Sequence, residues 1–259
     1  MDRETIEKLL ALNRAFYAAF AHSFAASRPV SDPALTCILP YIPARASVLD
    51  VGCGNGRLAA LLDQERPGTT YLGVDAVPEL VELARAQAAH LTAIAAEFRV
   101  ADVARPGWGE RLGGGRGGKE GKEGKEGREG KEGFDCAVAL AVLHHIPGFD
   151  LRVRVLREIA SLLKPGGRLI LSTWQFLDSP RMRRKIVDWA EADLAEEALE
   201  PGDYLLEWKR GGRGLRYCHL VDEAEAERLA AASGFRVRQA FRAGGREGDL
   251  SLIALLNPA

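Results

Sequence analysis

The chain has 259 residues, 47% of them hydrophobic, which is enough for one large domain or two small ones with a full core. The chain has 35 Lys and Arg against 36 Asp and Glu. This balance argues against a protein that binds nucleic acid through its net positive charge, so only a local basic face could bind it. No apolar run is as long as the about 18 residues that a membrane-spanning helix needs. The first residues are charged and contain no apolar signal-peptide core, so we expect a cytoplasmic protein that does not bind a membrane.

The first expected element is an N-terminal helix. Phe16, Phe20 and Phe24 recur every four residues, which gives a helix one aromatic face. Because such stripes most often pack against other elements, we expect residues 1–28 to form a helical cap on the domain.

Strand-like and helix-like segments then alternate along the chain. Apolar runs rich in strand-forming residues alternate with segments whose apolar residues are spaced by three and four, which is typical of a parallel sheet covered by helices. The expected strands are Ser47–Val51, Tyr71–Val74, Phe98–Ala101, Phe134–Leu140 and Arg168–Thr173. The expected helices are 58–62, 78–90 and 151–163, the last of them stopped by Pro165-Gly166-Gly167.

Residues 113–133 interrupt this pattern. They contain ten Gly, six Lys or Arg and five Glu, and no side chain that could fill a core. We expect a disordered Gly/Lys/Glu loop insertion. A charged arm that touches RNA is the alternative, and the near cancellation of charge argues against it.

The C-terminal part closes the sheet. Residues 175–220 have mixed character and are expected to form a variable substrate cap. A helix follows from its N-cap Asp222 to Ser233, and two strands, Phe235–Phe241 and Leu250–Leu256, are joined through Gly244-Gly245. We therefore expect one α/β domain, residues 1–259, with a seven-stranded, mostly parallel sheet that ends in an antiparallel hairpin.

The cysteines indicate neither disulfides nor a metal. Cys37, Cys53, Cys136 and Cys218 lie far apart, with no Cys-x-x-Cys pair and no paired His at ligand spacing. We expect free thiols and no metal site.

The strongest chemical signal is the strand that runs from Val48 into a glycine turn. Glycines at 52, 54 and 56 let a ligand approach the backbone, and the following helix N-terminus attracts an anion. Their spacing is G-x-G-x-G, whereas a dinucleotide site has G-x-G-x-x-G. The expected ligand contacts in this loop are Asp50, Gly52, Cys53, Gly54 and Gly56.

A carboxylate follows the next strand. Asp75 lies 19 residues after Gly56, where it can accept hydrogen bonds from both hydroxyls of a ribose. Such a carboxylate serves NAD and S-adenosylmethionine alike, and a bare surface aspartate is the alternative.

Together these segments resemble the class I S-adenosylmethionine-dependent methyltransferases. Leu162–Leu169 is similar to that family's turn into the fifth strand, and Ala139–His145 is similar to the segment beneath the cofactor. The resemblance implies a Rossmann-like class I methyltransferase fold with S-adenosyl-L-methionine as cofactor. It also implies that Asp102 accepts the adenine amino group, and the further cofactor contacts are Asp75, Ala76, Val103 and Ala139.

Other stretches resemble the bacterial branch of the tRNA wobble-uridine carboxymethyl methyltransferases. These are Phe16–Arg28, Ala141–His145, Gly202–Trp208 and Arg216–Leu220. That family esterifies a carboxymethyl group on uridine in the anticodon loop. The resemblance therefore implies a tRNA substrate, and because eukaryotic relatives work with one, a small activator protein as a partner.

The chemistry of such an acceptor suits the residues present. A carboxylate is a nucleophile at neutral pH and needs no strong base, so the site has to supply alignment and a cation. Arg28 is the candidate clamp, with a helix-terminal surface arginine as the alternative. One of His144 and His145 is expected to face the acceptor and the other to be structural, and the sequence leaves open which.

Two basic clusters provide the local face that RNA would need. Their cations are Arg181, Arg183, Arg184, Lys185, Lys209, Arg210, Arg213 and Arg216. We expect them to contact tRNA phosphates. Acidic residues between Asp188 and Glu200 make a solvated surface of mixed charge the alternative.

Three other functions stay open from the sequence. The same core could methylate a small metabolite or quinone precursor, since the fold does not choose the acceptor. A non-catalytic subunit that binds S-adenosylmethionine would keep the same cofactor residues. An NAD-dependent oxidoreductase is disfavoured by the glycine spacing and by the lack of an evident proton donor at a hydride site.

Overall fold

A computed structural model describes residues 1–28, 32–112 and 133–259 of the chain. The loop expected over 113–133 lies outside the described residues except for Gly133. Within the described residues, no helix is both long and apolar enough to cross a membrane.

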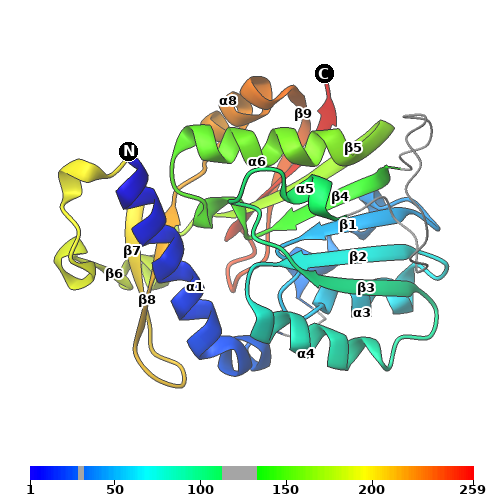
Figure 1. Ribbon diagram of the computed structural model, residues 1–259, viewed down its shortest axis with the longest axis horizontal. Coiled ribbons are helices and arrows are strands. Elements are labelled where there is room, and N and C mark those ends of the chain that lie inside the picture. Colours follow the sequence, from blue (N-terminus) through cyan, green and yellow to red (C-terminus); the bar gives the residue numbers. More distant parts are fainter. Residues whose placement is uncertain (29–31, 113–132) are drawn as a thin grey trace, which may run out of the picture.

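The centre of the fold is a seven-stranded sheet with the order β3-β2-β1-β4-β5-β10-β9 (Figure 1). Its strands are β1 (Ser47–Val51), β2 (Thr70–Asp75), β3 (Ala95–Val100), β4 (Phe134–Leu140), β5 (Leu163–Trp174), β9 (Phe235–Ala243) and β10 (Ser251–Pro258). The first five are parallel, and β10 runs antiparallel to both β5 and β9. The predicted sheet and its terminal hairpin are confirmed.

The helices lie near their predicted positions. They are α1 (Arg3–Ala26), α2 (Pro33–Thr36), α3 (Arg57–Glu65), α4 (Pro78–Ala88), α5 (Trp108–Arg111), α6 (Phe149–Leu162), α7 (Pro180–Arg183) and α8 (Glu223–Ser233), with 3-10 turns η1 (Leu39–Tyr41), η2 (Leu143–His145), η3 (Trp189–Ala192) and η4 (Glu196–Ala198). Two strands begin earlier than predicted: β3 begins at Ala95 instead of Phe98, and β5 begins at Leu163 instead of Arg168, so that Pro165-Gly166-Gly167 lies inside β5. Ala95 and Ala96 have low strand propensity, and pairing with Thr70 and Tyr71 of β2 extends the strand over them.

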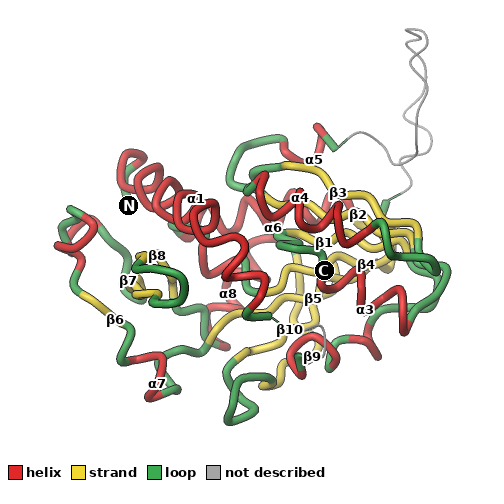
Figure 2. Tube along the Cα trace, turned by 90° about the horizontal axis from the view of Figure 1, so that it is seen from below, coloured by secondary structure: helices red, strands yellow, loops and turns green. Residues whose placement is uncertain are grey.

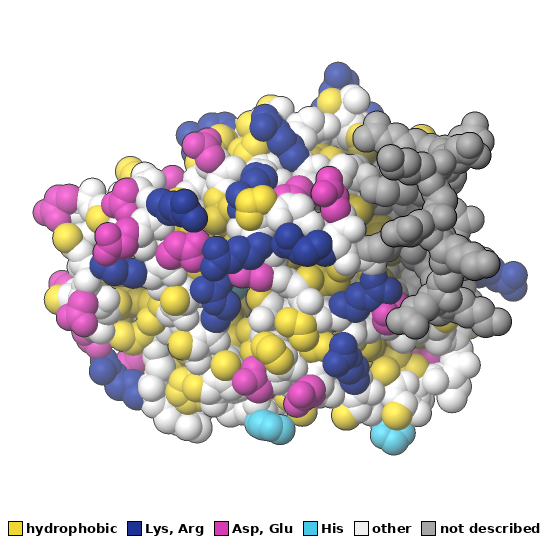
Figure 3. Space-filling model, in the orientation of Figure 1, with side chains coloured by type: hydrophobic (Ala, Val, Ile, Leu, Met, Phe, Trp, Pro, Cys, Tyr) yellow, Lys and Arg dark blue, Asp and Glu magenta, His cyan; other side chains and the backbone are white. Residues whose placement is uncertain are grey.

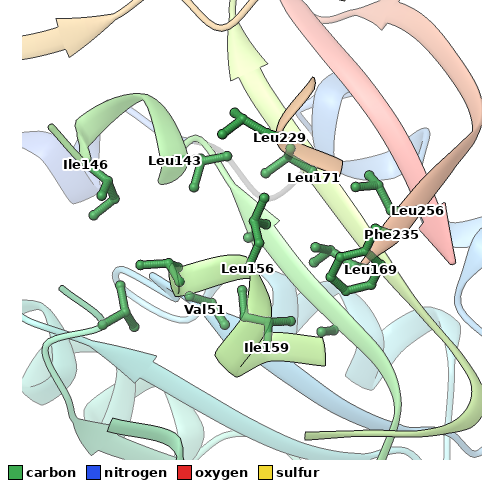
Figure 4. Close-up of a cluster of buried hydrophobic side chains, with 14 of the residues drawn as sticks. Val51, Leu143, Ile146, Leu156, Ile159, Leu169, Leu171, Leu229, Phe235 and Leu256 are labelled. Atoms are coloured by element: carbon green, nitrogen blue, oxygen red, sulfur yellow. The ribbon is translucent and has the colours of Figure 1, made fainter. Parts of the chain in front are cut away.

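Helices cover both faces of the sheet. On one face, Leu156 and Ile159 of α6 and Leu229 of α8 pack against Leu169 and Leu171 of β5 (Figure 4). On the other face, helices α3 and α4 contribute a second buried cluster. Truncating a fully buried leucine in such a layer costs about 2–5 kcal/mol, so this packing fixes where the strand ends lie.

A second, smaller sheet stands beside the first. It has the order β6-β7-β8, with β6 (Ile186–Val187), β7 (Asp203–Trp208) and β8 (Gly214–His219), all antiparallel. Figures 1 and 2 agree that α1 passes along the junction between the two sheets. A Cβ on Gly214 would lie 2.5 Å from Phe20 and 2.9 Å from Phe16, so the aromatic face of α1 packs closely on β8.

Candidate active site

A cavity of about 790 Å³ lies at the carboxyl ends of the parallel strands. Its walls come from the glycine loop after β1, the ends of β2, β3 and β4, helix α1 and the small sheet. Ligands of open parallel sheets bind at this edge, because the loops there are free to differ while the strands stay fixed. Both the predicted cofactor half and the predicted acceptor half open into this one space.

The glycine loop follows its predicted role in backbone geometry. Gly52 has φ of 71°, and a Cβ there would lie 2.2 Å from Val142 Cγ2, so the chain can turn only at a glycine. Gly54 has φ of 56° and nothing within 4 Å of a Cβ position, which leaves its backbone facing the cavity. Gly52, Cys53 and Gly54 all line the cavity.

The two predicted carboxylates lie on the same wall. Asp75 accepts hydrogen bonds from the N–H groups of Gly54, at 2.9 Å, and Val77, at 3.0 Å, which fix its orientation. Burial raises the pKa of Asp75, although these backbone hydrogen bonds act to lower it. Asp102 stands at the end of β3, and with Ala76 and Val103 it also lines the cavity.

Three predicted cofactor contacts do not reach the cavity. Asp50 is 4% exposed and accepts a hydrogen bond of 2.5 Å from the Tyr71 hydroxyl, and burial raises its pKa to about 7. Gly56 forms the N-cap of α3, where a Cβ would meet the ring of Phe98 at 3.1 Å. Ala139 points into the core instead, because successive strand residues face opposite sides.

The residues that follow Ala139 line the cavity where Ala139 was predicted to contact the cofactor. Leu140, Ala141 and Val142 all line the wall, and Ala141 has φ of 58°. This left-handed turn at a non-glycine residue redirects the chain from β4 into η2. The turn brings the two histidines beneath α1.

The structure separates the two histidines. His145 lines the cavity, whereas His144 is fully buried behind Trp174, with ring centroids 4.7 Å apart. His145 Nδ1 lies 2.9 Å from the Tyr217 carbonyl oxygen, which can only accept, so Nδ1 is the donor. Nε2 therefore accepts from the Tyr17 hydroxyl at 2.8 Å. Burial, then the nearby Arg216, lowers the pKa of His145 to about 3, so the ring is neutral.

Two guanidinium groups face the acceptor half of the cavity. Arg28 lies 4.6 Å over the Phe24 ring and 5.4 Å from the Trp174 ring, and burial, then repulsion from Arg57, lowers its pKa to about 10. Arg216 is 2% exposed and lies 4.6 Å over Trp174. Within the described residues, Arg216 Nε and Nη1 have no hydrogen-bond partner, and no carboxylate lies within 4.0 Å of either guanidinium.

Arg216 was expected among the cations that contact phosphate at the surface, and this expectation was wrong. Its side chain is buried on β8 between aromatic rings, including Phe16 at 5.3 Å and Trp208 at 5.5 Å. The sequence could not distinguish it from Arg213, which is exposed and forms ion pairs with Glu191 and Glu207.

Four further cations line the cavity, and the side where they lie, on which Arg210 and Arg246 are exposed, is called its mouth here: Arg181, Lys185, Arg210 and Arg246. In the described part of the chain none of them forms an ion pair, whereas Lys209 pairs with Glu207. Arg183 and Arg184 do not line the cavity, and Arg183 donates to the Leu177 carbonyl oxygen. On the face that Figure 3 shows, Lys and Arg are interspersed with Asp and Glu. Arg246 was missed in the sequence because only the β9–β10 hairpin brings it here.

Two groups of side chains have the composition of metal ligands. His144, His145 and Cys218 lie within 4.8 Å of one another, but the charge of Arg216 beside them disfavours a cation. In the second group, Glu200, Asp203 and His219, the side chains are already paired with one another and with Arg152. Neither group is arranged as an open metal site.

Comparison with known proteins decides the family. Residues 24–240 match a family model described as a methyltransferase domain. The chain belongs to this methyltransferase family. S-adenosylmethionine is the cofactor of this methyltransferase, and the open backbone at Gly54 and the Asp75 carboxylate on the cavity wall fit it.

The relatives of this methyltransferase differ in their acceptors. It is 25% identical to a tRNA (carboxymethyluridine(34)-5-O)-methyltransferase of Arabidopsis thaliana over 61% of this chain and 31% of that one. It is 34% identical to a ubiquinone biosynthesis O-methyltransferase of Xanthomonas axonopodis over 51% and 44% of the two chains. The match thus spans less than half of these curated relatives.

A solved structure supports the fold. A SAM-dependent methyltransferase from Methanosarcina mazei is 22% identical, with a TM-score of 0.60, over 85% of this chain and 95% of that one. At this identity the likeness concerns the fold, and the acceptor has to be argued from the cavity.

Proposed function

We propose that this methyltransferase esterifies a carboxylate, that of a carboxymethyl-type wobble uridine in tRNA. The observation that carries the proposal is the pair of guanidinium groups, Arg28 and Arg216, which face the acceptor half of the cavity with no carboxylate of the described residues within 4.0 Å of either. A buried charge without a partner is unfavourable, so an anionic acceptor that pairs with it gains free energy from this arrangement.

The protonation state of the site favours an acceptor that is already ionised. S-adenosylmethionine supplies an electrophilic methyl group when bound. His145, with its pKa near 3, is too weak a base to remove a proton from a hydroxyl of pKa about 10. A carboxylate needs no such step. The role of His145 is then to hold Tyr17 through the hydrogen bond to its hydroxyl.

Arg28 and Arg216 orient the acceptor. A guanidinium binds a carboxylate through two parallel hydrogen bonds, which leaves a lone pair of the carboxylate free for attack on the methyl group. Stacking on Trp174 holds both groups in place before the acceptor arrives. Alignment of this kind supplies much of the rate enhancement in a displacement between two bound groups.

The cations at the mouth favour a polyanion over a small acid. Arg181, Lys185, Arg210 and Arg246 have no carboxylate partners among the described residues, and each can pair with a phosphate. Burial, then repulsion from Arg216, lowers the pKa of Lys185, which an incoming phosphate would reverse. The similarity to the Arabidopsis tRNA (carboxymethyluridine(34)-5-O)-methyltransferase supports this acceptor.

A small-molecule acceptor is the second candidate. The identity of 34% to a ubiquinone biosynthesis O-methyltransferase favours it, as does the aromatic lining from Tyr17, Phe24 and Trp174. Such a phenolic acceptor must lose its proton, and His145, whose pKa is lowered to about 3, is a weak base for that step.

Variants of Arg216 test the proposal. Loss of a buried partner of a charged group costs about 2–4 kcal/mol, so we expect Arg216→Gln to lower kcat/KM with tRNA by about 30- to 700-fold. Arg28→Gln should behave similarly, and neither should change the Kd for S-adenosylmethionine. Arg213→Gln, in the same strand region but exposed, is the matched control. Equal rates for Arg216→Gln and Arg213→Gln would remove the guanidinium pair from the function.

A further inference from the structure

An arginine of the first helix reaches the cofactor half of the cavity. Arg14 of α1 lines the cavity, and its Nη1 lies 3.0 Å from Asp102 Oδ2. The two residues are 88 positions apart in the chain. The contact joins the N-terminal helix to the carboxylate at the end of β3.

Both oxygens of Asp102 are held. Oδ1 accepts a hydrogen bond from the N–H of Ala104 at 3.0 Å, while Oδ2 accepts from Arg14. Arg105 Nε is 3.5 Å from Oδ2, too far for a strong hydrogen bond. Since each carboxylate oxygen can accept two hydrogen bonds, both oxygens can still accept one from a ligand. Arg14 fixes the orientation of the carboxylate and therefore the direction of these remaining acceptor positions.

We propose that Arg14 is a positioning residue that holds Asp102 toward the adenine of the cofactor and thereby sets its preference for a 6-amino purine. An ionised carboxylate only accepts hydrogen bonds, so it pairs with the 6-amino group and repels a 6-oxo group. The strand order places β3 next beyond β2, and if Asp75 of β2 binds the ribose as expected from the sequence, Asp102 is the carboxylate nearest the base.

Arg14 has a simpler role that the test must exclude, that of attaching α1 to the domain. A second ion pair makes this attachment close by: Arg105 binds Glu7 of α1 through two hydrogen bonds of 2.8 and 2.9 Å. Glu7→Gln weakens that attachment and leaves the contact between Arg14 and Asp102 intact. It is therefore the matched control for a purely structural effect.

The experiment measures binding of two ligands to the full chain by calorimetry. The ligands are S-adenosylhomocysteine and its 6-oxo analogue, S-inosylhomocysteine. For the parent we expect at least about tenfold tighter binding of the 6-amino form. Arg14→Ala should weaken the 6-amino ligand by about 5- to 10-fold and leave the 6-oxo ligand nearly unchanged, so that the preference is lost.

Two variants make the outcome decisive. Arg14→Lys keeps a donor of the same charge and should restore part of the preference, while Glu7→Gln should keep all of it. If Arg14→Ala weakens both ligands by the same factor, or if Glu7→Gln loses the preference equally, Arg14 only attaches the helix and the proposal is overturned. The measurement involves no methyl acceptor, so its result is independent of the tRNA substrate.

Discussion

Asp50 carries a charge that the fold disfavours. It is 4% exposed on β1, and burial raises its pKa to about 7, above its ordinary value of 3.8. The Tyr71 hydroxyl, which donates to it, lowers the pKa only in part. Asp50 lies two residues before Gly52, so its ionisation changes the stability of the strand that positions the glycine loop.

The stability of the chain should therefore decrease as this carboxyl ionises. Because the folded state binds the proton more tightly than the unfolded state, the free energy of unfolding falls between about pH 4 and pH 7, by at most about 4 kcal/mol from this group. Asp50→Asn should remove this decrease and be more stable than the parent at about pH 8. Urea unfolding of both proteins at several pH values checks it, and parallel curves for the two proteins would contradict it.

At the residue scale, sequence patterns predict where a residue lies in the chain's local structure better than they predict which distant residues it contacts. The glycine spacing located Gly52 and Gly54 at the cavity because a backbone that must turn there has no alternative residue. Arg216 was misplaced because exposure depends on the packing of β8 under α1, which no local pattern encodes. Arg246 comes to the mouth only through the β9–β10 hairpin, far away in the chain.

At the element scale, a buried charge network joins the small sheet to the large one. His219 of β8 lies between Asp203 of β7, at 2.6 Å, and Glu225 of α8, at 2.8 Å. Arg152 of α6, 1% exposed, pairs with both Glu200 and Glu225. The network positions β8, and hence Arg216, relative to the central sheet.

This network should make the attachment of the small sheet depend on pH. Burial lowers the pKa of His219, but hydrogen bonds to Asp203 and Glu225 outweigh it and the pKa is raised. Its contribution to stability is thus fully present below about pH 6.5 and is lost as the pH rises through the raised value. Hydrogen exchange of β7 and β8 amides, corrected for intrinsic rates, should accelerate above that value in the parent. In His219→Gln this acceleration should be absent, and its persistence there would contradict the account.

The elements of the central sheet were predictable, and those of the small sheet were not. The strands β1 and β4 are mostly apolar and buried on both faces, so hydrophobicity marks them, whereas β3 and β9 are partly polar and largely exposed. The strands β7 and β8 are short and partly polar, and β6 has only two residues. Gly211 and Gly212 lie between β7 and β8, and they were an available signal for a hairpin.

At the scale of the whole molecule, cationic side chains gather along the cavity although the net charge is close to zero. The formal net charge is −1, yet the cavity has cations at its mouth and two guanidinium groups inside. Aspartates 75 and 102 lie in the cofactor half, where Arg14 pairs with Asp102. Under the proposed function, the guanidinium groups of Arg28 and Arg216 attract an anionic acceptor to their half of the cavity.

The central claim is that the acceptor is a carboxylate on tRNA. The most direct test incubates the protein with radiolabelled S-adenosylmethionine and total tRNA, with a small-molecule extract in parallel and Asp75→Ala as the blank. We expect label in tRNA that mild alkali releases, because alkali hydrolyses a methyl ester. Label in tRNA that resists alkali, or label only in the small-molecule extract, would contradict it.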